Sequence, residues 1–238
     1  MQGAIGIHHL GIAVADLDAI GAELSRDRKV DRDSDGTLHA ADDLGYRHAF
    51  RVARKRPYTV EPPVANVPGV AQRGPNQRID FTKPVRPRMI EHVVLRAQDW
   101  RKAMDFYVNR LQFRVSDIYT NAGCFLRAPG ARHHHDIFLI NIPGPALGLS
   151  HIAFAVADFN EVMLGGKRMV ERGWRSAFGP GKHVLGSSYF WYIDSPCGGT
   201  MEYSSDIDYA DDNWVPGEYV MTPEIVSAWI IPYGKGPG

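Results

Sequence analysis

The feature that most constrains the fold of this 238-residue chain is an internal repeat, in which a short apolar run begins at histidine and ends at aspartate. The three copies span residues 9–17, 92–100 and 151–159, and they align without gaps. Each copy is typical of a strand, followed by an aspartate that can cap a helix and then by an amphipathic stretch. A repeated supersecondary unit indicates a fold assembled from similar modules.

The segments after each copy complete the predicted module. Helices are expected at about 17–24, 100–111 and 159–172. Short strand-like runs broken by Gly, Pro and Asp follow each helix. Each unit is therefore predicted to be a strand and a helix followed by several strands, which makes the fold class α+β with repeated βαβββ modules.

The repeat also predicts the domain organisation. We expect four segments: an N-terminal module at 1–63, a linker at 64–88, a metal-binding catalytic domain of two modules at 89–203, and a tail at 204–238 that is a lid or an assembly element.

The first module is interpreted as a degenerate, non-catalytic copy. Its strands are expected at 5–14, 38–41, 46–53 and 58–61. His9 and Glu61 are separated by almost as many residues as the corresponding pair of the third module, but no preceding module supplies a third ligand.

Three residues of the second and third modules form a candidate metal site. Side chains alternate faces along a strand, so two modules that pair through their first strands can bring His92 and His151 to one cavity. Glu202 lies on a late strand of the third module, whereas the second module has 139–141 at the matching place and no carboxylate. Two histidines and one carboxylate with open coordination positions suit Fe(II) and dioxygen chemistry, while a structural zinc site uses four ligands.

Further polar residues can assist with proton transfer. His133, His134 and His135 open a predicted strand at 137–142, where alternation lets at most two of them face a cavity. We favour His135, which adjoins the strand, with His134 as the rival. His183 and Tyr192 lie in the run 181–202, and an imidazole or a phenol can accept or donate protons beside a metal.

The composition excludes several classes of protein. Lys+Arg and Asp+Glu number 27 each, so no net field attracts nucleic acid or a membrane surface. No apolar run approaches the roughly 20 residues that span a bilayer. Cys124 and Cys197 are too few for a disulfide framework, which favours a cytoplasmic location. A homo-oligomer is expected from the compact modules with an irregular tail.

The repeat, the metal-site residues and the run 181–202 together resemble the vicinal oxygen chelate superfamily, and within it the type I extradiol ring-cleaving dioxygenases. The family signature is matched at Gly181, His183, Tyr192, Pro196, Gly198 and Glu202. The sequence departs from the signature at Trp191, where an aliphatic residue or Phe is usual, and at Ser195 before the proline. These departures are interpreted as bearing on the substrate class. The resemblance covers 89–203, and such enzymes usually carry four modules where this chain shows three.

The resemblance implies the site chemistry. Fe(II), with Mn(II) as the alternative, would be held by His92, His151 and Glu202, and a catechol would chelate it with O2 as co-substrate. His135 resembles the distal histidine that handles protons. His183 and Tyr192 resemble residues that hydrogen-bond the diol oxygens.

Two other functions remain open from the sequence. One is a glyoxalase- or epimerase-like enzyme, which generally uses a fourth protein ligand from the partner module. The other is a non-catalytic binding protein of the bleomycin-resistance type, which needs no metal triad.

Overall fold

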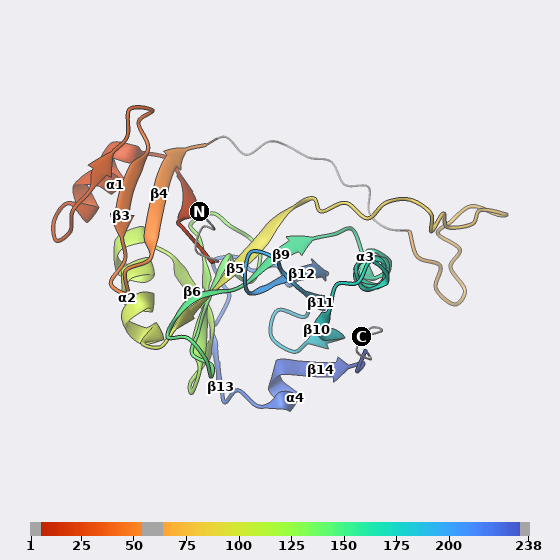
Figure 1. Cartoon of the computed structure of the whole chain (residues 1–238). Coiled ribbons are helices and arrows are strands. Elements are labelled where there is room, and N and C mark those ends of the chain that lie inside the picture. Colours follow the sequence, from red (N-terminus) through yellow and green to blue (C-terminus); the bar gives the residue numbers. More distant parts are fainter. Residues whose placement is uncertain (1–5, 54–63, 234–238) are drawn as a thin grey trace.

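Three units with the same order of elements make up the chain in this computed structural model, which describes residues 6–53 and 64–233 (Figure 1). The first unit comprises β1 (Leu10–Val14), α1 (Leu17–Leu24), β2 (Asp31–Arg32), β3 (Leu38–Ala41) and β4 (Arg47–Val52). The second comprises β5 (Met89–Ala97), α2 (Trp100–Leu111), β6 (Arg114–Tyr119), β7 (Gly123–Arg127) and β8 (Ile137–Ile140). The third comprises β9 (Leu147–Ala155), α3 (Phe159–Glu171), β10 (Ser176–His183), β11 (Tyr189–Asp194) and β12 (Thr200–Ser205). The α+β class and the repeated βαβββ module are confirmed.

The aspartate of each repeat caps its helix as expected. The carboxylates of Asp16, Asp99 and Asp158 each accept a hydrogen bond from a backbone N–H of the first turn. A capping side chain satisfies donors that have no partner within the helix, so the helix starts are fixed locally. The third helix ends at Glu171, one residue before the predicted end, because Arg172 and Gly173 already leave helical geometry.

The first strands of the second and third units meet in one ten-stranded sheet, as the repeat predicted. Strands β5 and β9 pair antiparallel, with His92 opposite Ala153 and His151 opposite Val94. This reciprocal pairing defines a pseudo-two-fold axis beside the Val93–Ile152 pair. The two histidines are therefore related by the axis.

The strand register identifies which residue of each unit corresponds to Glu202. Glu202 of β12 lies opposite Ala153, two residues after His151. In the second unit Phe138 lies opposite Val94, two residues after His92, so the matching residue is Phe138 rather than one at 139–141. The predicted position was wrong because the β7–β8 loop is longer than the β11–β12 loop. A carboxylate is absent there, as expected.

The first unit forms a separate four-stranded sheet with the order β1-β4-β3-β2. In its register Gly11 lies opposite Ala49, which therefore holds the place of Glu202. The sequence did not predict strand β2. With β2, β3 and β4 after the helix, the unit already has the three strands of the module when β4 ends. The predicted strand 58–61 and Glu61 lie outside the described residues, and β1 begins at Leu10 rather than at residue 5.

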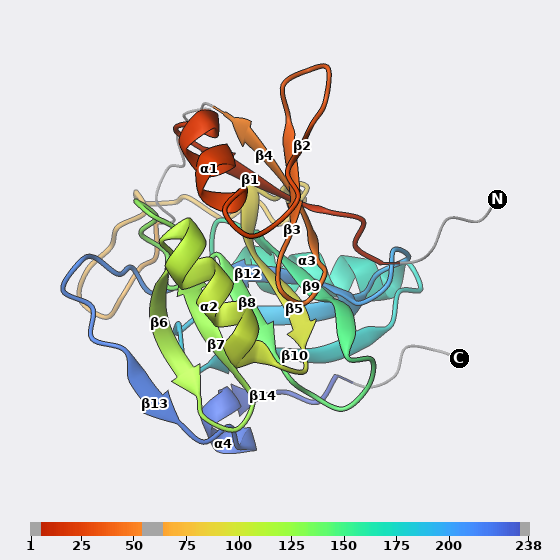
Figure 2. The same cartoon turned by 90° about the vertical axis from the view of Figure 1, so that its left-hand side faces the viewer.

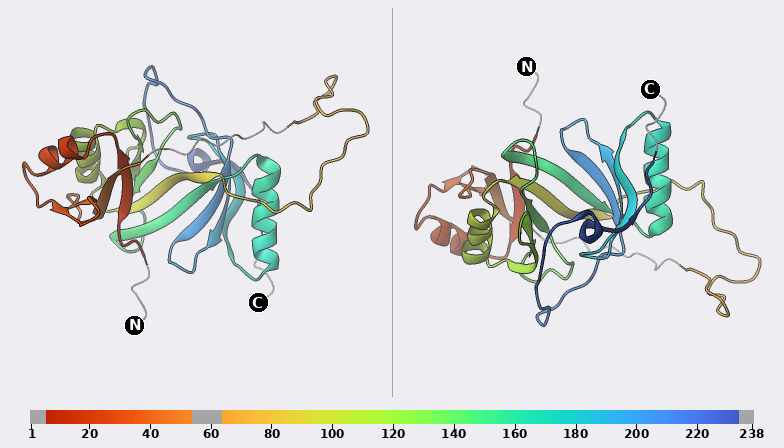
Figure 3. Two further views of the ribbon diagram at one scale, coloured as in Figure 1. Left: turned by 90° about the horizontal axis from the view of Figure 1, so that it is seen from above. Right: turned by 90° about the horizontal axis from the view of Figure 1, so that it is seen from below.

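Three hydrophobic clusters form the core, and the largest joins the first unit to the second. Leu38 and Phe50 of the first unit pack with Phe106 of α2 and Leu95 of β5, on the outer face of the second unit's sheet. The Tyr46 hydroxyl donates a hydrogen bond of 2.6 Å to the backbone oxygen of Arg96. The first unit and α3 lie on opposite sides of the paired strands β5 and β9 (Figure 3). Because the first unit, α2 and α3 pack on the outer faces, the inner face of the ten-stranded sheet can line a cavity.

The remaining segments run around the paired units. Residues 64–88 carry no helix, and Val85 packs against the cluster beneath α3. The C-terminal segment contains β13 (Gly217–Tyr219), α4 (Pro223–Val226) and β14 (Ser227–Ile230). Strand β13 pairs with β6 and β14 with β10, so the segment joins both outer edges of the large sheet and crosses its open side (Figure 2). No helix in the described part of the chain is long and apolar enough to span a membrane.

Candidate metal centre and cavity

The structure brings His92, His151 and Glu202 together at the junction of β5, β9 and β12. Their candidate ligand atoms lie within 4.8 Å of one another, and this is the one such group found among the described residues. The Glu202 Oε2 atom lies 3.3 Å from His92 Nε2 and 3.2 Å from His151 Nε2. Sheet pairing explains this convergence, since all three side chains project from the inner face.

The electrostatics of this group fit a bound cation. Both Glu202 carboxylate oxygens and His151 Nε2 are buried without a hydrogen-bond partner among the described residues. Burial disfavours the charged form of Glu202, yet the two imidazoles outweigh it and lower the pKa of this carboxyl. Burial lowers the pKa of His151, which favours the neutral imidazole that a metal ligand requires. Unpaired buried polar atoms of these types are expected where a metal completes their interactions.

Glu91 stands behind His92 and was missed by the sequence analysis. Its Oε2 atom lies 3.6 Å from His92 Nδ1, and both atoms are buried without a hydrogen-bond partner among the described residues. Burial disfavours charged His92, but Glu202 and Glu91 outweigh it and raise the pKa of His92 to about 9. Adjacent strand residues normally point to opposite faces, and a register irregularity between Ile90 and His92 brings them together here. No sequence signal marks this irregularity.

The histidine run is divided between the cavity and the protein interior. His135 lines the cavity, and its ring centroid lies 4.1 Å from that of His92. His134 is fully buried, and its Nε2 donates to Asp117 Oδ2 at 2.8 Å. With Nε2 as the donor to Asp117, Nδ1 of His134 can accept the Nδ1–H of His135 at 3.0 Å. His135 is left with an available Nε2.

His183 and Tyr192 meet on neighbouring strands. The Nδ1 atom of His183 donates to the backbone oxygen of Val226 at 2.8 Å, and its Nε2 lies 3.1 Å from the Tyr192 hydroxyl. Burial, followed by the charge of Glu202, raises the pKa of Tyr192 well above its usual value. Burial lowers the pKa of His183 and, more strongly, of His135. His135 and His183 are therefore neutral imidazoles beside a protonated phenol.

The cavity in front of these residues has a volume of about 360 Å³. Most of its wall is apolar. It is lined by His92, Tyr119, Phe125, His135, Phe138, Ile140, Ile142, Ser150, His151, Phe178, His183, Leu185, Ser188, Tyr192, Thr200, Met221 and Val226. Met221 and Val226 belong to the C-terminal segment, which thus closes part of the cavity.

Trp191 does not reach this cavity, although it departs from the family signature. Its indole is buried on the outer face, packs with Val162 and Val170 of α3, and donates to Ser176 Oγ at 2.9 Å. Gly166 makes room for it, because a Cβ there would lie 2.2 Å from the indole. Ser195 sits in the turn before β12, where its hydroxyl accepts from the Cys197 N–H. Neither departure bears directly on substrate contacts, which corrects that expectation.

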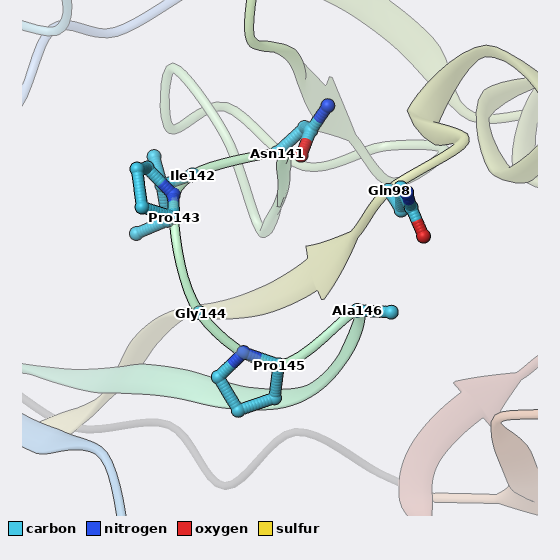
Figure 4. Close-up of a pocket in the computed structure, with 7 residues that line it drawn as sticks. All are labelled: Gln98, Asn141, Ile142, Pro143, Gly144, Pro145 and Ala146. Carbon is cyan, nitrogen blue, oxygen red and sulfur yellow. The ribbon is translucent and has the colours of Figure 1, made fainter.

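Two other places carry no comparable chemistry. A surface hollow of about 330 Å³ lies at the β8–β9 connection, formed by Gln98 and residues 141–146 (Figure 4), and none of its lining residues is titratable. His9 is exposed and its Nδ1 lies 2.9 Å from that of His8.

Comparisons with known proteins agree with the fold. Residues 89–203 match the sequence model of the Glyoxalase/Bleomycin resistance protein/Dioxygenase superfamily. A curated relative, metapyrocatechase 2 of Cupriavidus necator, is 39% identical over 150 residues, which are 62% of this chain. The chain spans 46% of that relative's length.

Solved structures extend the likeness over nearly the whole chain. The Mn(II)-bound glyoxalase of Novosphingobium aromaticivorans is 24% identical with a TM-score of 0.71, covering 95% of this chain and 71% of that protein. Homoprotocatechuate 2,3-dioxygenase of Arthrobacter globiformis is 20% identical with a TM-score of 0.72, covering 98% of this chain and 72% of that protein. At these identities the likeness is one of fold.

Proposed function

We propose that the chain is an extradiol dioxygenase, because residues 89–203 match the sequence model of the Glyoxalase/Bleomycin resistance protein/Dioxygenase superfamily. It would cleave a catechol ring next to the diol and place both atoms of O2 in the ring-opened product. The observation that carries this proposal is the unequal pair of last strands. Glu202 completes a three-residue ligand set on one side, and Phe138 stands at the matching place on the other. The 39% identity to metapyrocatechase 2 supports the same reaction class.

His92, His151 and Glu202 would hold Fe(II), with Mn(II) as the alternative. Two imidazoles and one carboxylate suit a divalent first-row metal with open positions, once the metal has displaced the proton of His92. When bound, the metal supplies a place where the diol and O2 can meet and a charge that favours loss of the diol protons. Glu91 would accept the Nδ1–H of His92 and thereby keep Nε2 free for the metal.

His183 and Tyr192 would orient the diol. The backbone oxygen of Val226 keeps the proton of His183 on Nδ1, so Nε2 can accept a hydrogen bond or a proton. The Tyr192 hydroxyl is held protonated by burial and by Glu202, and it donates to His183 Nε2 in this structure. Rotation of this hydroxyl would let it donate to a diol oxygen and free His183 Nε2 to accept a diol proton.

His135 would act as the acid–base group on the other side of the cavity. Burial keeps its imidazole neutral, and the hydrogen bond to His134 leaves Nε2 available to take a proton. The same group can return that proton to the opening ring. The apolar wall excludes water, so protons move between these named groups rather than through solvent.

The direct test uses protein purified without oxygen and loaded with Fe(II). Admission of air in the presence of catechol should give a yellow ring-opened product and consume one O2 per diol. Mass spectrometry after reaction with ¹⁸O2 should find both labelled atoms in the product. Bound iron with neither colour nor oxygen uptake across a broad catechol panel would contradict the proposal.

A glyoxalase- or epimerase-like activity is less favoured. Such sites generally take a fourth ligand from the partner module, and the register assigns Phe138 to that position. A non-catalytic binding protein would have no need for the ligand group and its surrounding acid–base residues.

A further inference from the structure

The two walls of the cavity differ in chemistry, although they come from units with the same register. In the third unit Tyr192 lies opposite Glu202 on the neighbouring strand. In the second unit Phe125 lies opposite Phe138 in the same relation. At these two positions a polar residue of one wall has an apolar counterpart on the other. Phe125 and Phe138 stack with ring centroids 4.1 Å apart, which makes their wall flat and apolar.

The rest of the cavity extends this apolar surface. Leu185 and Met221 join the same hydrophobic cluster as the two phenylalanines. The hydroxyl of Tyr119 is 3.3 Å from the backbone oxygen of Ile225, to which it donates, so it offers the cavity its ring.

No fixed cation is available for an acidic substituent. Among the described residues that line the cavity there is no lysine and no arginine. The side chains of Ser150, Ser188 and Thr200 contribute hydroxyls only. His183 donates its Nδ1–H to Val226, so its Nε2 is an acceptor and offers no proton to a carboxylate. A carboxylate placed here would lose water without gaining an opposite charge, which is costly.

The cavity is also larger than a single ring requires. Its volume is about 360 Å³. An apolar protein cavity of about 150 Å³ is sufficient to bind benzene. More than half of the space is therefore available to a substituent on the diol ring.

We infer that this cavity accepts uncharged catechols that carry an apolar substituent, up to a second aromatic ring, and discriminates against catechols that carry a carboxylate. The inference rests on the proposed ring-cleaving function. The diol would lie toward His92 and His151, and the substituent would lie against Phe125 and Phe138.

The test compares substrates that differ in charge at one place. The probes are 2,3- and 3,4-dihydroxyphenylacetate and their methyl esters, with unsubstituted catechol as reference, on Fe(II)-loaded protein. We expect kcat/KM for each acid to be at least about 30-fold below that of its ester, from the cost of an unpaired buried carboxylate. A smaller ratio at both ring positions overturns the charge argument. Failure to cleave catechol itself would instead overturn the proposed function.

A second comparison tests whether the cavity is large enough for a second ring. The better of 3-phenylcatechol and 4-phenylcatechol should have a kcat/KM no lower than that of catechol. A lower value for both isomers overturns the inference that a second ring fits.

A charge variant links the discrimination to this wall. Met221 lines the cavity from the C-terminal segment and has no proposed catalytic role. In Met221→Lys the acid-to-ester ratio of kcat/KM should rise at least about tenfold, while Met221→Gln, of similar length without charge, should leave it unchanged. An equal effect of both variants, or none from Lys, would show that missing charge is not the cause.

Discussion

The second and third units share one topology and one register, yet they contribute different kinds of side chain to the site. His92 and His151 are equivalent, whereas Phe138 corresponds to Glu202 and Phe125 to Tyr192. The third unit thus supplies a carboxylate and a phenol, and the second supplies two stacked rings. The backbones of the two units are related by the pseudo-two-fold axis, but the side chains at these two positions make the cavity walls different.

The outer faces of the same two units differ by an exchange of size. Gly166 of α3 and Tyr107 of α2 each lie eight residues after their capping aspartate, and Trp191 corresponds by register to Cys124. One unit packs a small helix residue against a large strand residue, and the other does the reverse. The exchange keeps the summed side-chain size at this contact similar in the two units, as close packing requires.

The largest effect should come from removing the carboxylate that distinguishes the third unit. Glu202→Ala should abolish turnover and weaken Fe(II) binding roughly 10²–10³-fold, since each protein ligand contributes roughly 2.5–4 kcal/mol in four-ligand sites. Phe138→Ala, at the equivalent position, should keep the metal. Iron content after dialysis measures both. Equal iron loss in the two variants would break the comparison.

His135 tests whether the second unit contributes chemistry as well as an apolar wall. His135→Ala should retain iron and lose about 10²–10⁴ in kcat, the range for a general acid–base group. His133→Ala, in the same run but outside the cavity lining, serves as control and should keep its activity. Iron loss from His135→Ala would mean that the ligand group is wrongly assigned.

The exchange of size on the outer face can be tested by stability. Gly166→Ala should lower the free energy of unfolding by about 1–3 kcal/mol, because its Cβ would overlap the indole of Trp191. Trp191→Phe in the same chain should recover part of this loss, measured by urea unfolding in a double-mutant cycle. The exposed neighbour change Lys167→Ala is the control. Additive effects of the two substitutions would contradict the proposed contact.

Glu91 should have a smaller, purely supporting effect on the metal. Glu91→Gln removes the negative charge beside His92 Nδ1 and should weaken metal affinity about 10–100-fold, as is usual for residues behind a metal ligand. Glu218→Gln, an exposed carboxylate on β13, should leave affinity unchanged. Competition with a fluorescent chelator measures both constants, and unchanged affinity in Glu91→Gln would exclude the contact.

The mildest test varies pH rather than sequence. The pKa of His92 is raised to about 9 without metal, so this imidazole carries a proton below that pH and the metal must displace it. Affinity for Mn(II) should therefore increase by up to about tenfold per pH unit between pH 6 and 8. Electron paramagnetic resonance of free Mn(II) follows the titration. A flat profile would contradict a proton on His92.

Local signals in the sequence predicted the three helices that follow the repeats and the convergence of His92, His151 and Glu202. Asp16, Asp99 and Asp158 cap helices through contacts within three residues, and strand alternation was sufficient to bring His92 and His151 to one face. These features depend on short-range geometry.

The features that the sequence did not predict depend on strand register and on contacts between residues far apart in the sequence. Phe138 could not be matched to Glu202 because loop length decides which residues pair across strands. Glu91 reaches His92 through a strand irregularity, and Asp117 meets His134 across 17 residues of sequence. The C-terminal segment showed no clear periodicity, since β13 and β14 are short edge strands.

The hydrogen bond from His183 to the main-chain oxygen of Val226 has an evolutionary consequence. Every amino acid carries that oxygen, so no single substitution at position 226 can delete the acceptor. The tautomer of His183 is thus robust to mutational drift, whereas that of His134 is inherited only as long as position 117 keeps an acceptor side chain. Residue 226 can therefore vary among descendants of this chain to suit new ligands without altering where the His183 proton resides.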